Sequence, residues 1–211
     1  MERDSAVGER IVIRLANPEK DAADILALYA PYIEKTAITF ETEVPSLETF
    51  ARRVKDIASE FPYLLLEVDG ELAGYAYAHR QAERAAFGWN AELSIYLKER
   101  FTGCGLGRPL YRLLEELLEM QGYINFYGVI TASNEGSIAL HEKMGYRIIG
   151  THERTGYKFG TWHGVVWMHR RAHEDAPRAI VSVHALDPAA VGEKMESARK
   201  NIEEKWASRP L

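Results

Sequence analysis

Apolar residues in the first part of the chain alternate between short extended runs and helical spacing. The run over residues 10–15 predicts a strand. Asn17 and Pro18 then predict a helix start, because Asn caps helices and Pro suits the first helical position. An extended segment over residues 37–40 leads to a second expected helix, which Ser46 caps. The pattern so far is a strand, two helices and a short extended segment.

The rest of the chain continues with strands and helices. Asp69-Gly70 separates two apolar runs, 63–68 and 72–78, and predicts a hairpin. Glycines end two later helices, at positions 122 and 145. The other expected elements are strands 91–97, 126–131, 146–150 and 157–169, a helix over 134–144, an edge strand at 180–183 and a charged helix from 187 to about 206. Hairpins are too numerous for a regular doubly wound sheet, so we expect an α/β or α+β fold.

Charge and cysteine content narrow the classes of function. The chain has 26 Lys and Arg against 31 Asp and Glu, a net charge of −5, which argues against a general nucleic-acid binder. The single cysteine, Cys104, excludes an internal disulfide framework and a Cys-rich zinc site, and the histidines lack metal-site spacing. Residues 1–10 are charged, unlike a signal peptide, and no run approaches the roughly 20 apolar residues of a membrane span. We expect a cytoplasmic protein with no metal, nucleic-acid or membrane partner.

A glycine-rich turn over residues 103–107 joins an expected strand to a leucine-rich helix. Glycines let a backbone approach a ligand closely, and a helix start offers free N–H groups, so the turn suits a phosphate or pyrophosphate. Gly107-Arg108-Pro109 fails the phosphate-loop pattern of NTPases, and Arg108 occupies the third glycine position of the dinucleotide fingerprint. A tight turn that merely needs glycines remains the alternative.

A second polar pattern lies on the helix over residues 134–144. Asn134, Ser137 and His141 stand at i, i+3 and i+7 and therefore share one face. This places an amide, a hydroxyl and an imidazole in one line. Without further context, an N-cap followed by a solvated helix face explains the same pattern.

Together these motifs resemble the GNAT acetyltransferase superfamily, and more narrowly its phosphinothricin and methionine sulfoximine or sulfone N-acetyltransferase branch. The likeness runs from about Ile11 to Met168. The motifs that carry it are Phe40-Glu41-Thr42-Glu43, Gly74 to Ala78, Trp89 to Tyr96, the glycine turn, Asn134-x-x-Ser137, Glu142-Lys143-Met144-Gly145-Tyr146 and Gly160-Thr161-Trp162-His163. The resemblance implies a mixed, mostly antiparallel sheet flanked by helices, in a GNAT domain over 1–171. Residues 172–211 would be an extension with an amphipathic helix.

The resemblance also implies direct transfer of acetyl from acetyl-CoA to the primary amine of a small amino-acid analogue, within a ternary complex. Glu92 would be the base, on a strand face shared with Ser94 and Tyr96, and His141 the acid that protonates the thiolate. A solvated Glu and a structural His are the alternatives. The residues expected to bind acetyl-CoA are Ser94, Ile95, Tyr96, Leu97, Arg100, Gly103, Cys104, Gly105, Leu106, Gly107, Arg108, Asn134 and Ser137. Those expected to bind the amine substrate are Phe40, Arg80, Arg84, Trp162 and His163.

One position departs from the pattern of the superfamily. Its acyl-CoA loop usually reads Arg/Gln-x-x-Gly-x-Gly/Ala, and Thr102 stands at the first position here, although Arg100 offers the same pattern two residues earlier. This departure keeps open an acyl-CoA-binding module without turnover as an alternative function. A GNAT enzyme for protein N-termini or polyamines is a second alternative. A homodimer is expected because dimers are usual in this branch.

Overall fold

Seven strands form one sheet in the computed structural model, which describes residues 11–208. Residues 1–10 and 209–211, and with them the charged N-terminal segment, lie outside the described residues. The strands are β1 (Ile11–Leu15), β2 (Tyr63–Val68), β3 (Glu71–Arg80), β4 (Asn90–Leu97), β5 (Asn125–Thr131), β6 (Arg147–Lys158) and β7 (Thr161–Arg171). Their order is β1-β2-β3-β4-β5-β7-β6, and β4–β5 is the parallel pair among antiparallel neighbours. The sheet is mixed and mostly antiparallel, as expected.

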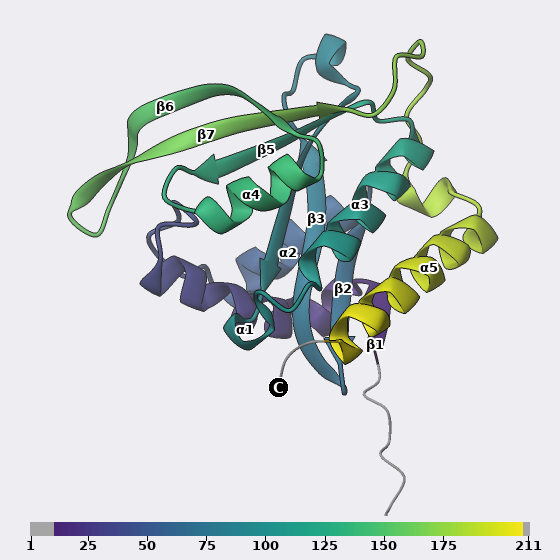
Figure 1. The fold of residues 1–211 in the computed structure, drawn as a ribbon, viewed down its shortest axis with the longest axis horizontal. Coiled ribbons are helices and arrows are strands. Elements are labelled where there is room, and N and C mark those ends of the chain that lie inside the picture. Colours follow the sequence, from purple (N-terminus) through teal and green to yellow (C-terminus); the bar gives the residue numbers. More distant parts are fainter. Residues whose placement is uncertain (1–10, 209–211) are drawn as a thin grey trace, which may run out of the picture.

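Within residues 11–208, five α-helices flank the sheet. They are α1 (Pro18–Lys35), α2 (Leu47–Ala58), α3 (Gly107–Gln121), α4 (Glu135–Lys143) and α5 (Pro188–Ala207). Figure 1 shows α1 and α2 on one face and α3, α4 and α5 on the other. The two predicted caps are confirmed: the Asn17 side chain accepts from the Glu19 amide, and that of Ser46 accepts from the Thr49 amide.

Each face of the sheet packs its own hydrophobic core. On the α3 side, Leu64 and Leu66 of β2 pack with the buried leucines of α3. On the α1–α2 side, Leu65 and Tyr75 pack with Ile25 and other residues of these helices. Successive residues of a strand point to opposite faces, so an almost continuous apolar run such as β2 serves both cores. Packing of helices on both faces holds the strands in place, including the strands that line the candidate site.

Two predicted extended segments are not strands. Residues 37–40 form a loop, which is held because the Thr131 hydroxyl donates to the Ala37 carbonyl at 2.6 Å. Residues 180–183 likewise join no sheet: the Val181 amide donates to the Gln121 carbonyl, and the Val183 amide to that of Glu60. Apolar composition suggested a strand only over residues 180–183, but its backbone groups find partners at a helix end and in a loop. Among residues 11–208, no helix has the length and apolar character needed to cross a membrane.

Candidate active site

The two parallel strands at the centre of the sheet separate part-way along their length. β4 pairs with β5 only from Asn90 to Glu92, whereas its pairing with β3 continues to Leu97. A narrow cavity of about 50 Å³ opens where the strands diverge, lined by β4, β5, α4 and the loop before α2. Backbone groups of β4 beyond Glu92 on this side lack a β5 partner and can hydrogen-bond to an extended ligand.

The polar face of α4 lines this cavity. Asn134, Ser137 and His141 all border it, together with Ser94, Ile95 and Tyr96 of β4. Asn134 is the N-cap of α4, and its side-chain oxygen accepts from the Ser137 amide at 3.2 Å. The structure thus brings together six of the residues that the sequence assigns to catalysis and cofactor binding.

His141 is buried and held at both ring nitrogens. Its Nδ1 lies 2.8 Å from the Ser137 carbonyl oxygen, and its Nε2 lies 2.8 Å from the Tyr111 hydroxyl. Because a carbonyl only accepts, Nδ1 carries the proton in the neutral ring and the Tyr111 hydroxyl donates to Nε2. Burial lowers the pKa of His141, partly offset by the Ser137 hydrogen bond. Gly128 of β5 leaves room for this ring, since a Cβ there would lie 2.7 Å from Nε2.

Glu92 lies on the other face of the sheet, the side of α1 and α2. Successive side chains of a strand alternate between the two faces of the sheet, so Tyr96, four residues along β4, lies on the same face as Glu92. Its ring centroid is 5.0 Å from that of Tyr29 on α1. Desolvation raises the pKa of Glu92, and the charge of His79 on β3 opposes that rise. The two side chains approach to 3.7 Å, between His79 Nε2 and Glu92 Oε1. The candidate base and acid therefore lie on opposite faces of the sheet, with Glu92 at the last position where β4 pairs with β5 and His141 at the cavity just beyond it.

The glycine turn leads into an α3 N-terminus without a side-chain cap. Gly103 and Gly105 have φ values of +73° and +79°, a conformation that favours glycine. The first turn of α3 has no acidic residue and carries the exposed Arg108. Free backbone amides and a cation at a helix start attract anions. The glycine turn and the first turn of α3 are therefore suited to bind the phosphates of acetyl-CoA. Leu106 is buried in the core, and the Cys104 thiol lies 3.5 Å from the Thr102 carbonyl oxygen within the turn.

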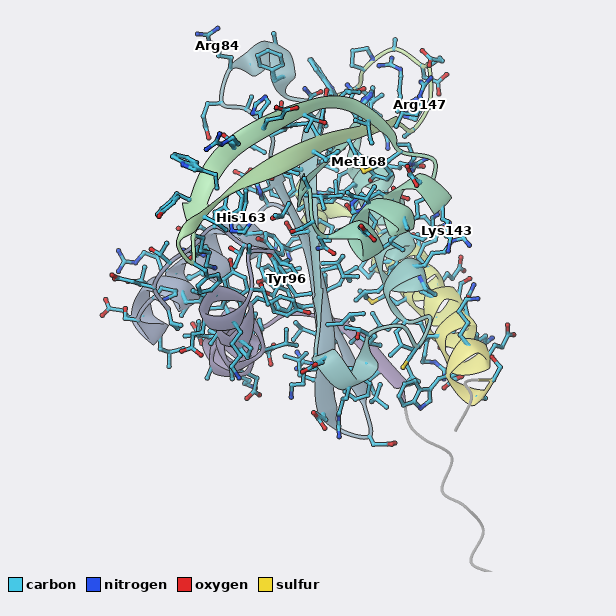
Figure 2. All side chains as sticks on the ribbon, turned by 60° about the vertical axis from the view of Figure 1, so that its left-hand side comes forward. Arg84, Tyr96, Lys143, Arg147, His163 and Met168 are labelled. Carbon is cyan, nitrogen blue, oxygen red and sulfur yellow. The ribbon has the colours of Figure 1, made fainter. Side chains whose placement is uncertain are left out.

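Phe40 and His163 meet beside the β6–β7 hairpin. Their ring centroids are 6.2 Å apart, and a Cβ on Gly156 of β6 would lie 2.3 Å from the Phe40 ring. The ammonium of Lys158 donates to the Thr39 carbonyl at 2.8 Å, which ties the loop before α2 to the hairpin. Figure 2 shows His163 above Tyr96, on the side of the sheet that carries Glu92. Phe40 and His163 therefore lie on the side of the sheet where the amine substrate is expected to bind.

Other candidates lie away from the gap. Arg80 follows His79 on β3 and so points to the opposite face from Glu92, where it pairs with Glu60 at 2.8 Å. Arg84 points outward from the loop at the top of Figure 2. Trp162 is half exposed beside Tyr157 at the hairpin tip. Arg100 pairs with Glu71 and lies over the Phe101 ring, so it is not directed at the glycine turn.

Three further residues at the site are not indicated by the sequence motifs. Tyr111 lies among the leucines of α3, and a hydroxyl on an otherwise apolar helix face was the available signal. His79 is placed opposite Glu92 by the β3–β4 register, and Tyr77 opposite Ser94 by the same register. No local motif marks these two, because their positions depend on pairing between strands.

Comparison with known proteins agrees with this geometry. The family model described as "Acetyltransferase (GNAT) domain" matches residues 13–167. The chain belongs to the GNAT acetyltransferase family. It is 34% identical over 157 residues to phosphinothricin N-acetyltransferase of Streptomyces viridochromogenes, a match that covers 74% of this chain and 86% of that protein. It is 31% identical over 150 residues to an L-methionine sulfoximine/L-methionine sulfone acetyltransferase of Pseudomonas paraeruginosa, covering 70% and 87% of the two chains.

A solved structure gives the same fold. The phosphinothricin acetyltransferase from Sinorhizobium meliloti, in complex with AcCoA, superposes with a TM-score of 0.77 at 29% identity, covering 83% of this chain and 97% of that one. The GNAT fold and an acetyl-CoA-dependent N-acetyltransferase activity are therefore established for this protein. Within residues 11–208, no group of His, Cys, Asp and Glu side chains is arranged to hold a metal ion.

Proposed function

We propose that the protein acetylates the primary amine of a small amino-acid analogue of the phosphinothricin or methionine sulfone type. The observation that carries the proposal is the gap between β4 and β5, with Glu92 on one face and His141 on the other. The curated relatives with phosphinothricin and methionine sulfoximine or sulfone in their names support this substrate class. The rings of Phe40 and His163, with centroids 6.2 Å apart, offer an aromatic surface suited to a small amino-acid analogue.

Glu92 is proposed to take the proton of the substrate ammonium. An alkylammonium is not nucleophilic, so the amine must lose a proton before it reacts. The raised pKa of Glu92 makes its carboxylate a stronger base than an ordinary exposed one. His79 lies beside the carboxylate, with its Nε2 3.7 Å from Oε1.

Bound acetyl-CoA would supply the activated acetyl group as a thioester. Backbone groups of Ser94, Ile95 and Tyr96 would hold its extended arm, with Asn134 on the facing helix. His141 stays our candidate for the group beside the departing sulfur. Nδ1 is held by the Ser137 carbonyl and Nε2 accepts from the Tyr111 hydroxyl, so a proton would reach or leave Nε2 through this hydroxyl or after the hydrogen bond opens. The lowered pKa of His141 means that it donates as an imidazolium only below its usual range.

The test is release of free coenzyme A from acetyl-CoA with a panel of amines. The panel contains phosphinothricin, methionine sulfone, methionine sulfoximine, common amino acids, spermidine and a short peptide. Amine-dependent release is expected with the first three. Faster release with spermidine or the peptide than with all three would contradict the proposed substrate class and favour the alternative GNAT function.

We also propose a cytoplasmic homodimer. Acetyl-CoA dependence supports the cytoplasmic location. The dimer is supported by β6, a long strand at the edge of the sheet with exposed apolar side chains, because such an edge is suited to pairing with a second chain. On the β6–β7 hairpin, the exposed large apolar residues are Ile148, Ile149, Tyr157, Phe159 and Trp162.

An Ile149→Lys variant is expected to reduce the dimer to monomers. Ile149 is 56% exposed in the single chain, so a charge there costs the monomer little but is buried unpaired in an interface. Light scattering would give a mass of two chains for the unmodified protein and one for the variant. Val181→Lys, also at an exposed apolar residue but outside the hairpin, serves as the control. A single-chain mass for the unmodified protein would contradict the dimer.

A further inference from the structure

Helix α5 is fixed against the glycine turn although it lies outside the region that matches the family. The family model ends at residue 167, and α5 begins at Pro188. Ile202 and Trp206 are the buried residues of α5. The Trp206 ring packs 5.5 Å from that of Phe101, in the short helical turn just before the glycines. The last turns of α5 are therefore anchored directly beside the expected phosphate site.

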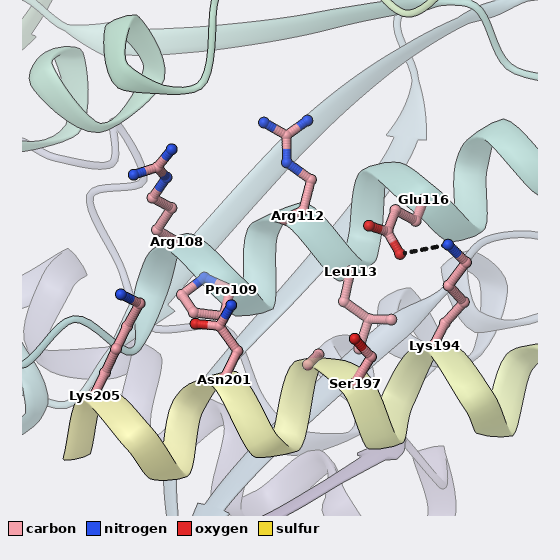
Figure 3. A pocket seen from close by; sticks show the side chains of 10 residues that line it. Arg108, Pro109, Arg112, Leu113, Glu116, Lys194, Ser197, Asn201 and Lys205 are labelled. Atoms are coloured by element: carbon pink, nitrogen blue, oxygen red, sulfur yellow. Dashed lines mark ion pairs between the residues drawn. The ribbon is translucent and has the colours of Figure 1, made fainter. Parts of the chain in front are cut away.

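The Lys205 side chain lies beside one of the loop glycines, Gly105, which is exposed. A Cβ on Gly105 would lie 3.4 Å from both Cβ and Cδ of Lys205, an ordinary van der Waals contact, so the lysine stem runs next to the loop. Figure 3 shows the Lys205 side chain rising from α5 toward the first turn of α3, where Arg108 also lies. A long stem packed on a backbone, with its ammonium free at the end, leaves the charge available to a ligand.

The groove between α3 and α5 carries an excess of positive charge. It has a volume of about 360 Å³, and its charged lining residues are Arg108, Arg112, Lys194, Lys205 and Glu116. Glu116 is engaged by Lys194 at 3.1 Å, at the other end of the groove. Within the described part of the chain, no ion pair joins Lys205 or Arg108 to an acidic residue. Two cations thus stand uncompensated beside the glycine turn.

The segment just before the glycine turn supplies no basic side chain to the expected phosphate site. Arg100 is engaged by Glu71 and the Phe101 ring, and the Thr102 hydroxyl donates to the Glu99 carbonyl at 2.7 Å. Positive charge near Gly105 therefore comes from α5 and from Arg108.

We propose that Lys205 binds the phosphate groups of acetyl-CoA together with Arg108 and the amides at the start of α3. The C-terminal extension would then be part of the cofactor site rather than only a cover for the sheet. This inference rests on the proposed placement of acetyl-CoA over the glycine turn.

The test compares cofactor affinity in two matched variants by calorimetry. Lys205→Met keeps the stem that packs on Gly105 and removes the charge, so we expect the Kd for coenzyme A to rise about 5–30-fold. The Kd for S-acetylpantetheine, which has the same thioester arm and no phosphates, is expected to stay unchanged. Lys200→Met on the same helix is the control and should leave both constants unchanged. Lys205→Arg should retain most of the affinity for coenzyme A.

Dephospho-coenzyme A distinguishes the phosphate involved. Equal weakening of coenzyme A and its dephospho form in Lys205→Met assigns Lys205 to the pyrophosphate, and weakening of coenzyme A alone assigns it to the 3′-phosphate. An unchanged Kd for coenzyme A in Lys205→Met would overturn the inference, as would an equal loss in Lys200→Met or an equal loss for S-acetylpantetheine. Failure of the unmodified protein to bind coenzyme A would overturn the proposed function as well.

Discussion

Replacement of Glu92 by Gln is expected to lower kcat by about 10²–10⁴-fold, the usual loss when a general base is removed. The amide keeps the size of the side chain but takes no proton from the substrate ammonium. The affinity for acetyl-CoA should stay close to that of the unmodified protein, because Glu92 faces the α1–α2 side of the sheet, away from the glycine turn. Steady-state kinetics with the best amine of the panel, together with calorimetry for acetyl-CoA, would measure both effects.

The pH dependence gives this prediction a second readout. Glu92 acts in its ionised form, so kcat/KM should rise with pH through the pKa of Glu92 in the free enzyme. Desolvation places that pKa above its ordinary value of 4.5, so the rise should occur above pH 4.5 and should be absent in the Gln variant. Glu48→Gln, at an exposed residue in the first turn of α2, is the control. Turnover of the Glu92 variant within a few-fold of the unmodified protein would remove this residue from the mechanism.

The substitution Gly128→Ala is expected to destabilise the protein by about 1–3 kcal/mol, as overpacking of a buried site does. The new methyl group would lie 2.7 Å from His141 Nε2 and 2.8 Å from its Cδ2. The ring cannot move aside without losing its hydrogen bonds to Tyr111 and Ser137. Thermal unfolding would show the effect as a lower Tm, by about 2–4 °C for each kcal/mol in a chain of this size.

Gly136→Ala is the matched control because it is expected to raise the Tm, whereas Gly128→Ala is expected to lower it. Gly136 lies in the first turn of α4, and a Cβ there would meet no atom within 4 Å. An alanine restricts the unfolded chain and is expected to stabilise by about 0.4–1 kcal/mol. If Gly128→Ala left the Tm unchanged or raised it as Gly136→Ala is expected to, the tight packing of His141 against β5 would be contradicted.

Local signals in the sequence predicted most of the fold. Asn17 and Ser46 cap their helices through their own side chains, and Asp69-Gly70 turns the β2–β3 hairpin, because each depends on a few neighbouring residues. Residues 180–183 were predicted wrongly for the converse reason. Their hydrogen-bond partners, at Gln121 and Glu60, lie far away in the chain.

The residues of the site also fall into two groups: those indicated by local sequence patterns and those placed by contacts between distant parts of the chain. Helical spacing alone placed Asn134, Ser137 and His141 on one face, and they do line one cavity. Strand alternation fixed the face of Glu92, but the divergence of β4 from β5 comes from the packing of the whole sheet. Arg80 was assigned to the substrate pocket from its charge, whereas its place on β3 sends it to Glu60. The approach of Lys205 to Gly105 joins residues one hundred positions apart in the chain, and no local pattern indicates it.

A crystal structure of the protein with bound acetyl-CoA tests the proposed placement of the cofactor and of the two catalytic candidates. We expect the extended arm to lie against β4 beyond Glu92, with the phosphates over the glycine turn. The thioester should sit in the gap between β4 and β5, near His141 and just beyond Glu92. Acetyl-CoA bound elsewhere, with its thioester away from this gap, would contradict the proposed mechanism.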